Sequence, residues 1–250
     1  MKTLSMATWN CQRVQASSNG IARLKTDNLD IIMLQEAPKP FRDAYPAGGG
    51  IKNDDTGNYH VIAPKTDNQQ DAYACRSYIL LKKSTFEGVV RKELPVQSGA
   101  HNAYRYPAMA DATVKVDNKD MILRIISAHT TSGFGGAHNT DEVIEAITEF
   151  DSTTVVGADF NSNEGVYSGP LKIPANKTQK SGHAIDGFTK ENGNYIDNEK
   201  RLLVEIKDVI ISNSFRLILD DGCYLNGTNV RLSDHIPVVS KLECTLANNQ

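Results

Sequence analysis

The chain has 250 residues, with 27 Lys and Arg against 30 Asp and Glu and a formal net charge of −3. Hydrophobic residues make up 40% and charged residues 23%, which excludes a disordered chain and a strongly basic, histone-like one. No apolar run approaches the roughly 20 residues that a membrane-spanning helix needs, so we expect no transmembrane segment. A chain of this size can bury a large core, and no linker interrupts it, so we expect one domain over residues 1–250.

The N-terminal segment carries one positive charge and lacks the apolar core of a signal peptide. This predicts either a cytoplasmic protein or a secreted mature chain with an added Met. The cysteines are too widely spaced for a zinc site of the CxxC type. We expect buried or half-buried thiols, although their even number also permits two disulfides. The cysteines are Cys11, Cys75, Cys223 and Cys244.

Hydrophobic patterning predicts a chain dominated by strands. In chain order the expected strands are Leu4–Trp9, Asp30–Leu34, Tyr59–Ala63, Ser77–Leu81, Ala108–Val116, Met121–Ala128, Thr153–Val156, Val209–Ser212, Phe215–Leu219 and Pro237–Leu242. The segment Asp117–Asp120 is typical of a hairpin turn between two of them.

Helical spacing of apolar residues predicts a short helix over Gly20–Asn28 and a longer one from Asn139 or Thr140 to Phe150. Acidic residues in its first turn favour the second helix. Two polar stretches, Pro38–Asp55 and Ser162–Gly193, are predicted to be long loops that shape a site or fill an edge.

Polar residues with catalytic or ligand chemistry stand at the borders of the expected strands. Each alone has an ordinary explanation as a turn, a cap or a solvated strand end. Together they indicate a site for a hard divalent cation, because carboxylate and amide oxygens suit Mg²⁺, and imidazoles beside carboxylates suit proton transfer near neutral pH. The residues are Asn10, Glu36, His129, Asp159, Asn161, Asp208, Asp234 and His235.

The order of these motifs resembles the endonuclease/exonuclease/phosphatase superfamily, which includes type I deoxyribonucleases, exonuclease III-like repair enzymes, sphingomyelinases and inositol-phosphate 5-phosphatases. The resemblance implies an α/β fold with four layers, in which two mixed β-sheets pack face to face and helices lie outside. It extends over nearly the whole chain. The motifs are TWN, LQE, R-x-P-A, SAH, ADFN, KDVIIS and SDHIPV.

Within this superfamily the chain most resembles the catalytic subunit of cytolethal distending toxins. The likeness lies in Ala7–Gln12, Leu34–Ala37, the glycine-rich segment Gly133–Gly136 and above all Arg76, where type I deoxyribonucleases carry a glutamate. Three features depart from the pattern: Ala158 replaces the usual glycine, Cys11 stands where leucine is common, and no secretion signal is present.

By this resemblance Glu36 is the principal metal ligand, supported by Asn10 and Asp234, and the ion is Mg²⁺, with Mn²⁺ or Ca²⁺ able to substitute or assist. His235 is expected to form a dyad with Asp208 and to take a proton from the attacking water.

The remaining predicted residues act on the substrate. His129 faces the phosphate, Asp159 and Asn161 orient the nucleophile, and Arg76 and Arg105 clamp the phosphate through their guanidinium groups.

These assignments predict a divalent-metal-dependent phosphodiesterase, in particular an endonuclease that nicks DNA. DNA is then the partner as substrate, with toxin delivery subunits as further partners of a genotoxin. The alternative enzyme is a phosphoinositide or phosphomonoester phosphatase that uses the same residues. A non-catalytic binding module with this fold is less favoured, because such a protein is expected to lose at least one residue of the set.

Overall fold

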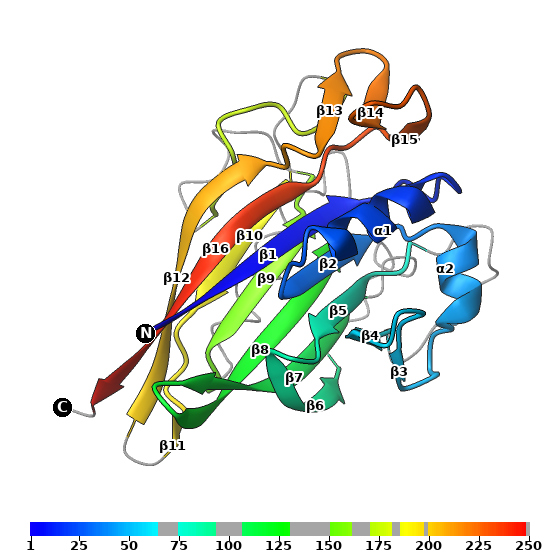
Figure 1. Cartoon of the computed structure of the whole chain (residues 1–250). Coiled ribbons are helices and arrows are strands. Elements are labelled where there is room, and N and C mark those ends of the chain that lie inside the picture. Colours follow the sequence, from blue (N-terminus) through cyan, green and yellow to red (C-terminus); the bar gives the residue numbers. More distant parts are fainter. Residues whose placement is uncertain are drawn as a thin grey trace.

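The computed structural model describes residues 1–64, 75–93, 107–130, 151–161, 171–181, 186–197 and 200–248 (Figure 1). Most of these residues lie in strands, and two helices, α1 (Ser17–Thr26) and α2 (Lys39–Ala44), accompany them. Within the described part of the chain, neither helix has the length and apolar character that a transmembrane span requires.

The larger sheet contains eight strands and includes both termini of the described chain. Its order is β11 (Ile196–Asp197), β12 (Lys200–Ile211), β16 (Val238–Asn248), β1 (Lys2–Asn10), β2 (Ile31–Gln35), β5 (Tyr78–Lys82), β4 (Tyr59–Ile62) and β3 (Ile51–Asn53). Strands β1 and β2 are parallel and the other neighbours are antiparallel, so the sheet is mixed.

The second sheet has five strands and is also mixed, because β8 and β9 are parallel. Its order is β10 (Asp186–Glu191), β9 (Thr154–Asp159), β8 (Lys119–His129), β7 (Ala108–Val116) and β6 (Phe86–Lys92). A small third sheet, β13 (Phe215–Ile218), β14 (Gly222–Leu225) and β15 (Arg231–Ser233), projects beyond the start of β16 in Figure 1.

The two large sheets pack face to face through alternating apolar side chains. Met6 and Met33 from the first sheet enter one buried cluster with Leu123 and Ile125 from the second. Gly157 in β9 permits this approach, because a Cβ atom there would lie 2.6 Å from the Cε of Met33. A side chain at this position would force Met33 to move within the close-packed core.

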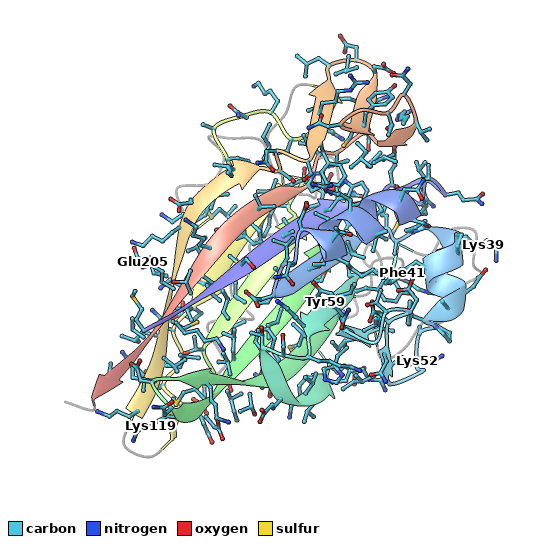
Figure 2. The ribbon with its side chains drawn as sticks, in the orientation of Figure 1. Lys39, Phe41, Lys52, Tyr59, Lys119 and Glu205 are labelled. Carbon is cyan, nitrogen blue, oxygen red and sulfur yellow. The ribbon has the colours of Figure 1, made fainter. Side chains whose placement is uncertain are left out.

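The two helices cover the outer face of the larger sheet. Ile21 and Leu24 of α1 join a second buried cluster with Trp9, and Phe41 of α2 packs against the same cluster. Figure 2 shows Phe41 directed from α2 toward the sheet, whereas Lys39 points away from it. The ring of Phe41 meets that of Tyr78 edge to face, with centroids 5.2 Å apart.

The fold class predicted from the sequence is confirmed: two mixed sheets lie face to face, with helices outside the larger one. The predicted turn after Val116 is also present, and both Asp117 and Asn118 adopt the positive φ of a tight hairpin. The predicted helix ending at Phe150 lies outside the described residues. All four cysteines carry thiols rather than disulfides.

Some elements were not predicted. Helix α2 lies within the stretch Pro38–Asp55, which was expected to be a loop, and β10 lies within Ser162–Gly193. Strand β12 is much longer than the predicted Val209–Ser212, because it begins at Lys200 and pairs with β16 along most of its length.

Candidate active site

The site forms where strands of both sheets end. Strands β1 and β2 run parallel and finish side by side, with Asn10 opposite Gln35, so Asn10 and Glu36 emerge at one edge. In the other sheet His129 lies opposite Asp159, and Asp159 lies opposite Asp186. The segment that precedes β16 adds Asp234 and His235, because the start of β16 pairs with the end of β1.

Asp159 is the centre of the contacts and is 1% exposed. Its Oδ2 accepts a hydrogen bond from Nδ2 of Asn10 at 2.8 Å and lies 3.4 Å from Nε2 of His129 and 3.8 Å from Nε2 of His235. Its Oδ1 accepts a hydrogen bond from the backbone N–H of Asn161 at 2.9 Å. Burial raises the pKa of the Asp159 carboxyl, and the charge of His235 only partly opposes this.

Glu36 joins this cluster through His129. Its Oε1 lies 3.6 Å from Nδ1 of His129, and its Oε2 lies 3.0 Å from Nε of Arg13. The backbone of Glu36 has a φ of 47°, in the left-handed region that is costly for a residue with a side chain. The parallel end of β2 and the backbone hydrogen bond from Arg13 N–H to Glu36 C=O, 2.7 Å long, hold this conformation.

His235 forms its dyad with Asp186, which the sequence analysis missed. Nδ1 of His235 lies 2.9 Å from Oδ2 and 3.1 Å from Oδ1 of Asp186, and the carboxylate is fully buried. Asp186 begins β10, whose antiparallel register on β9 places it beside Asp159. A carboxylate at Nδ1 fixes the Nδ1–H tautomer and leaves Nε2 able to accept a proton.

The prediction that Asp208 pairs with His235 is wrong. Asp208 lies within β12, where the register against β16 shifts between Lys207 and Ile210, and it has a φ of 51°. This bulge directs Asp208 to the surface, where the side chain is 62% exposed and accepts a hydrogen bond from Nζ of Lys241 at 2.9 Å.

The charge state of His235 follows from opposing effects. Burial lowers the pKa of the imidazole, but the charges of Asp186 and Asp159 outweigh burial, and the net pKa is raised. Nε2 of His235 also lies 3.3 Å from Nε2 of Gln179, whose amide can donate to it when the imidazole is neutral. His235 is therefore a strong base held against a buried carboxylate.

A buried polar network fixes the strand ends beneath the site. Nε2 of Gln35 donates to Oγ of Ser127 at 3.0 Å and to Oγ1 of Thr8 at 3.1 Å, and so links the two large sheets. Nε1 of Trp9 donates to the backbone carbonyl of His235 at 2.9 Å. The site residues therefore stand on rigid, fully buried supports.

The predicted metal ligands belong to one connected network with a donor set suited to a hard cation. Asn10 joins it through Asp159, Asp234 through His235 and Glu36 through His129. Oδ1 of Asp234 is buried and has no hydrogen-bond partner among the described residues, although it lies 3.4 Å from Nε2 of His235. A buried carboxylate oxygen in this state fits a cation ligand.

Two further groupings concern metal chemistry. Asp159, Asp186 and His235 place one ligand atom each within 4.8 Å of one another, and so do Glu36, Cys75 and His129. The sequence analysis did not single out Cys75 for either chemistry or metal binding.

Of the two arginines predicted to bind phosphate, the structure describes Arg76 but not Arg105. Arg76 is 8% exposed, and its backbone carbonyl accepts a hydrogen bond from the N–H of Ala37 at 3.5 Å, so it lies beside the Glu36 turn. Nδ2 of Asn161 donates to the backbone carbonyl of Thr130 at 2.7 Å. Arg105 lies outside the described residues. Arg13, which contacts Glu36, is a further cation that the sequence analysis did not assign to the site.

Comparison with models of known protein families and with the sequences of curated proteins gives no match. Solved structures do match. An endonuclease/exonuclease/phosphatase from Bacteroides vulgatus has 16% sequence identity and a TM-score of 0.63, and the match covers 98% of this chain and 100% of that one.

Two further structures agree along almost their whole length. TDP2 of D. rerio, solved in complex with a single strand DNA product, has 13% identity and a TM-score of 0.60, over 97% of this chain and 100% of that chain. The human Nocturnin catalytic domain, solved with a bound sulfate anion, has 12% identity and a TM-score of 0.60, over 97% and 95%. The likeness establishes the endonuclease/exonuclease/phosphatase fold.

Proposed function

We propose that this protein is a divalent-metal-dependent phosphodiesterase that nicks DNA. The observation that carries the proposal is the buried pair of His235 and Asp186, which leaves Nε2 of His235 facing Asp159. Nε2 of His129 contacts the same carboxylate oxygen. Two imidazoles around one buried carboxylate, with one of them oriented by a second carboxylate, are suited to proton transfer, and the pKa of His235, raised to about 10 by Asp186 and Asp159, makes this base most effective at alkaline pH.

Glu36, Asn10 and Asp234 would hold the metal ion, and Mg²⁺ is the ion that their hard oxygen donors suit best. When bound, it would stabilise the negative charge that develops on the substrate phosphate. The buried, unpartnered Oδ1 of Asp234 supports this assignment.

The side chains of the protein divide the remaining work. Asp186 accepts a hydrogen bond from Nδ1–H of His235, and Nε2 of His235 takes a proton from the attacking water. Asp159, held by Asn10 and the backbone of Asn161, orients that water. His129 donates to the phosphate oxygens, where Arg76 and Arg105 add positive charge.

DNA is the substrate that we favour over a phosphomonoester. A nucleic-acid backbone offers phosphates on both sides of the scissile bond, which suits two arginines beside one metal site. The structure of D. rerio TDP2, solved with a single strand DNA product, offers a precedent for nucleic acid on this fold. The resemblance to toxin subunits at Arg76 further favours DNA nicking and extends the proposal to a genotoxin with delivery subunits.

The test compares plasmid nicking and phosphate release from phosphoinositides with the same preparation of the full chain. We expect Mg²⁺-dependent conversion of supercoiled plasmid to nicked circles. His129→Ala should reduce nicking by roughly 10²- to 10⁴-fold. His60→Ala, in β4, is the matched control and should retain activity. Phosphate release with intact plasmid at enzyme excess would favour the phosphatase, and inactivity in both assays would overturn the proposal.

A further inference from the structure

We propose that Glu36, Cys75 and His129 form a binding site for a thiophilic divalent cation of the Zn²⁺ type. We further propose that an ion bound there inhibits the enzyme. The inhibitory part rests on the proposed function, whereas the binding site does not. The ligand atoms of the three side chains all lie within 4.8 Å of one another, and Nδ1 of His129 is 3.6 Å from Oε1 of Glu36.

The spacing fits a small coordination sphere. With Zn–S near 2.3 Å and Zn–N or Zn–O near 2.0–2.1 Å, tetrahedral angles place ligand atoms about 3.5 Å apart. The observed Glu36–His129 separation already has this length. Cys75 needs a shift of at most about 1.3 Å, the difference between the 4.8 Å limit and this ideal spacing.

The three ligands are carried by neighbouring strand ends. Glu36 follows β2, and Cys75 precedes β5, which pairs with β2 at Leu34 and Tyr78. The hydrogen bond from Ala37 N–H to the Arg76 carbonyl, 3.5 Å long, ties the two segments together next to both ligands. His129 ends β8 and is buried. Rigid supports of this kind preorganise a metal site.

The chemistry of this set separates it from the proposed Mg²⁺ set. A thiolate is a soft ligand that selects Zn²⁺ and related ions, whereas Mg²⁺ prefers oxygen. One thiolate, one imidazole and one carboxylate leave a fourth position for water, as in many three-ligand zinc sites. Binding displaces the thiol proton of Cys75 to solvent, so the step needs no other reactant.

Inhibition follows from the shared ligands. Glu36 belongs to both sets, and His129 contacts Asp159 in the proton-transfer cluster. An ion that takes Glu36 and His129 removes one ligand of the catalytic metal and one phosphate donor at the same time. Zn²⁺ should therefore compete with Mg²⁺, although Cys75 itself takes no part in the proposed reaction.

The binding test uses Co²⁺ as a spectroscopic probe of the metal-free full chain. We expect one equivalent of Co²⁺ to give sulfur-to-metal charge-transfer absorption in the near ultraviolet and tetrahedral bands in the visible, and Zn²⁺ to displace it. Cys75→Ser should abolish the charge-transfer band. It should also weaken Zn²⁺ binding by at least roughly 10- to 100-fold. That is the affinity lost when a residue that only supports a ligand is removed, and Cys75 is itself a ligand.

Cys244→Ala is the matched control, because Cys244 pairs with Lys2 at the end of β1 remote from the site. It should bind Co²⁺ and Zn²⁺ as the unmodified protein does. A Co²⁺ spectrum without the sulfur band, or equal Zn²⁺ affinity in Cys75→Ser, would overturn the site.

The inhibition test measures plasmid nicking at fixed Mg²⁺ with increasing Zn²⁺. Cys75→Ser should keep its Mg²⁺-dependent activity and require at least tenfold more Zn²⁺ for half-inhibition. Equal sensitivity of both proteins to Zn²⁺ would overturn the inhibitory role. If no nicking occurs at all while the Co²⁺ signature is present, the proposed function fails and the metal site stands.

Discussion

Replacing Asp186 by Asn tests the dyad that the structure reveals. The substitution keeps the size of a fully buried side chain and removes its charge. The Asn amide can turn its Nδ2 toward Nδ1 of His235, which favours the tautomer that carries the proton on Nε2. In that tautomer His235 cannot accept a proton from the attacking water.

The expected loss is that of general base catalysis. We expect kcat/KM for plasmid nicking to fall by roughly 10²- to 10⁴-fold, which corresponds to about 3–5 kcal/mol of transition-state stabilisation. The pKa of His235 should also fall, because the charge of Asp186 raises it and burial lowers it. The rising limb of the pH–rate profile should therefore move to lower pH in the variant, which a purely structural role of Asp186 would not cause.

The assay includes Asp208→Asn as the matched control, since Asp208 is exposed and paired with Lys241. It should lower the rate by less than about twofold, within the range of surface substitutions. The double variant of Asp186→Asn and His235→Ala should be no slower than His235→Ala alone. A large loss from Asp208→Asn with normal activity of Asp186→Asn would refute the reasoning.

Three further changes test the packing, the electrostatics and the substrate contact. Gly20→Ala should lower the melting temperature: helix propensity favours Ala by about 1 kcal/mol, but its Cβ would lie 2.4 Å from the Trp9 ring, an overpacking cost of about 1–3 kcal/mol. Asp54→Asn should reduce the free energy of unfolding at pH 7 by about 2 kcal/mol, because hydrogen bonds from Thr56, Tyr59 and Lys25 outweigh burial and lower the pKa of Asp54 from 3.8 to about 2. That contribution is present above pH 3.8 and is lost as pH falls through 2, so denaturant titrations from pH 5 to pH 2 should show a weaker pH dependence in the variant. Arg105→Ala should make the plot of log rate against log salt less steep by about one unit and leave the affinity for Mg²⁺ unchanged, as a phosphate contact requires.

The sheet structure could be predicted where one face of a strand is buried. From Ala110 to Val116, buried residues of β7 alternate with partly or fully exposed ones, and the predicted and observed limits of β7, Ala108–Val116, are the same. Polar residues at strand borders were informative for a similar reason, because parallel strands such as β1 and β2 end at a common edge. Asn10 and Glu36 could thus be expected to lie close together.

Asp186 was missed because local sequence does not reveal strand pairing. It lies in a polar stretch, and only the register of β10 on β9 places it beside Asp159. The available signal was weak: an aspartate that begins the short segment Asp186–Phe188, of which Gly187 and Phe188 are buried. Asp208 was wrongly assigned to the site because it precedes an apolar run, as a strand-border residue would. It lies on a bulge that turns its side chain to solvent, and local sequence does not reveal that bulge.

Contacts made by charged side chains across the site could not be predicted either. The proximity of Cys75 to Glu36 depends on the pairing of β2 with β5, and that of Arg13 depends on consecutive left-handed residues at Gln12 and Arg13. Backbone conformations of this kind are uncommon for residues with side chains, and no sequence pattern signalled them.

The most direct test of a metal-dependent phosphodiesterase is nicking of supercoiled plasmid by the metal-stripped full chain during a titration with Mg²⁺. We predict no nicking in EDTA, recovery with Mg²⁺ or Mn²⁺, and a curve for Glu36→Gln displaced to much higher Mg²⁺ while the variant keeps its fold by circular dichroism. Full activity of Glu36→Gln in EDTA would contradict both the metal dependence and the placement of the metal at Glu36.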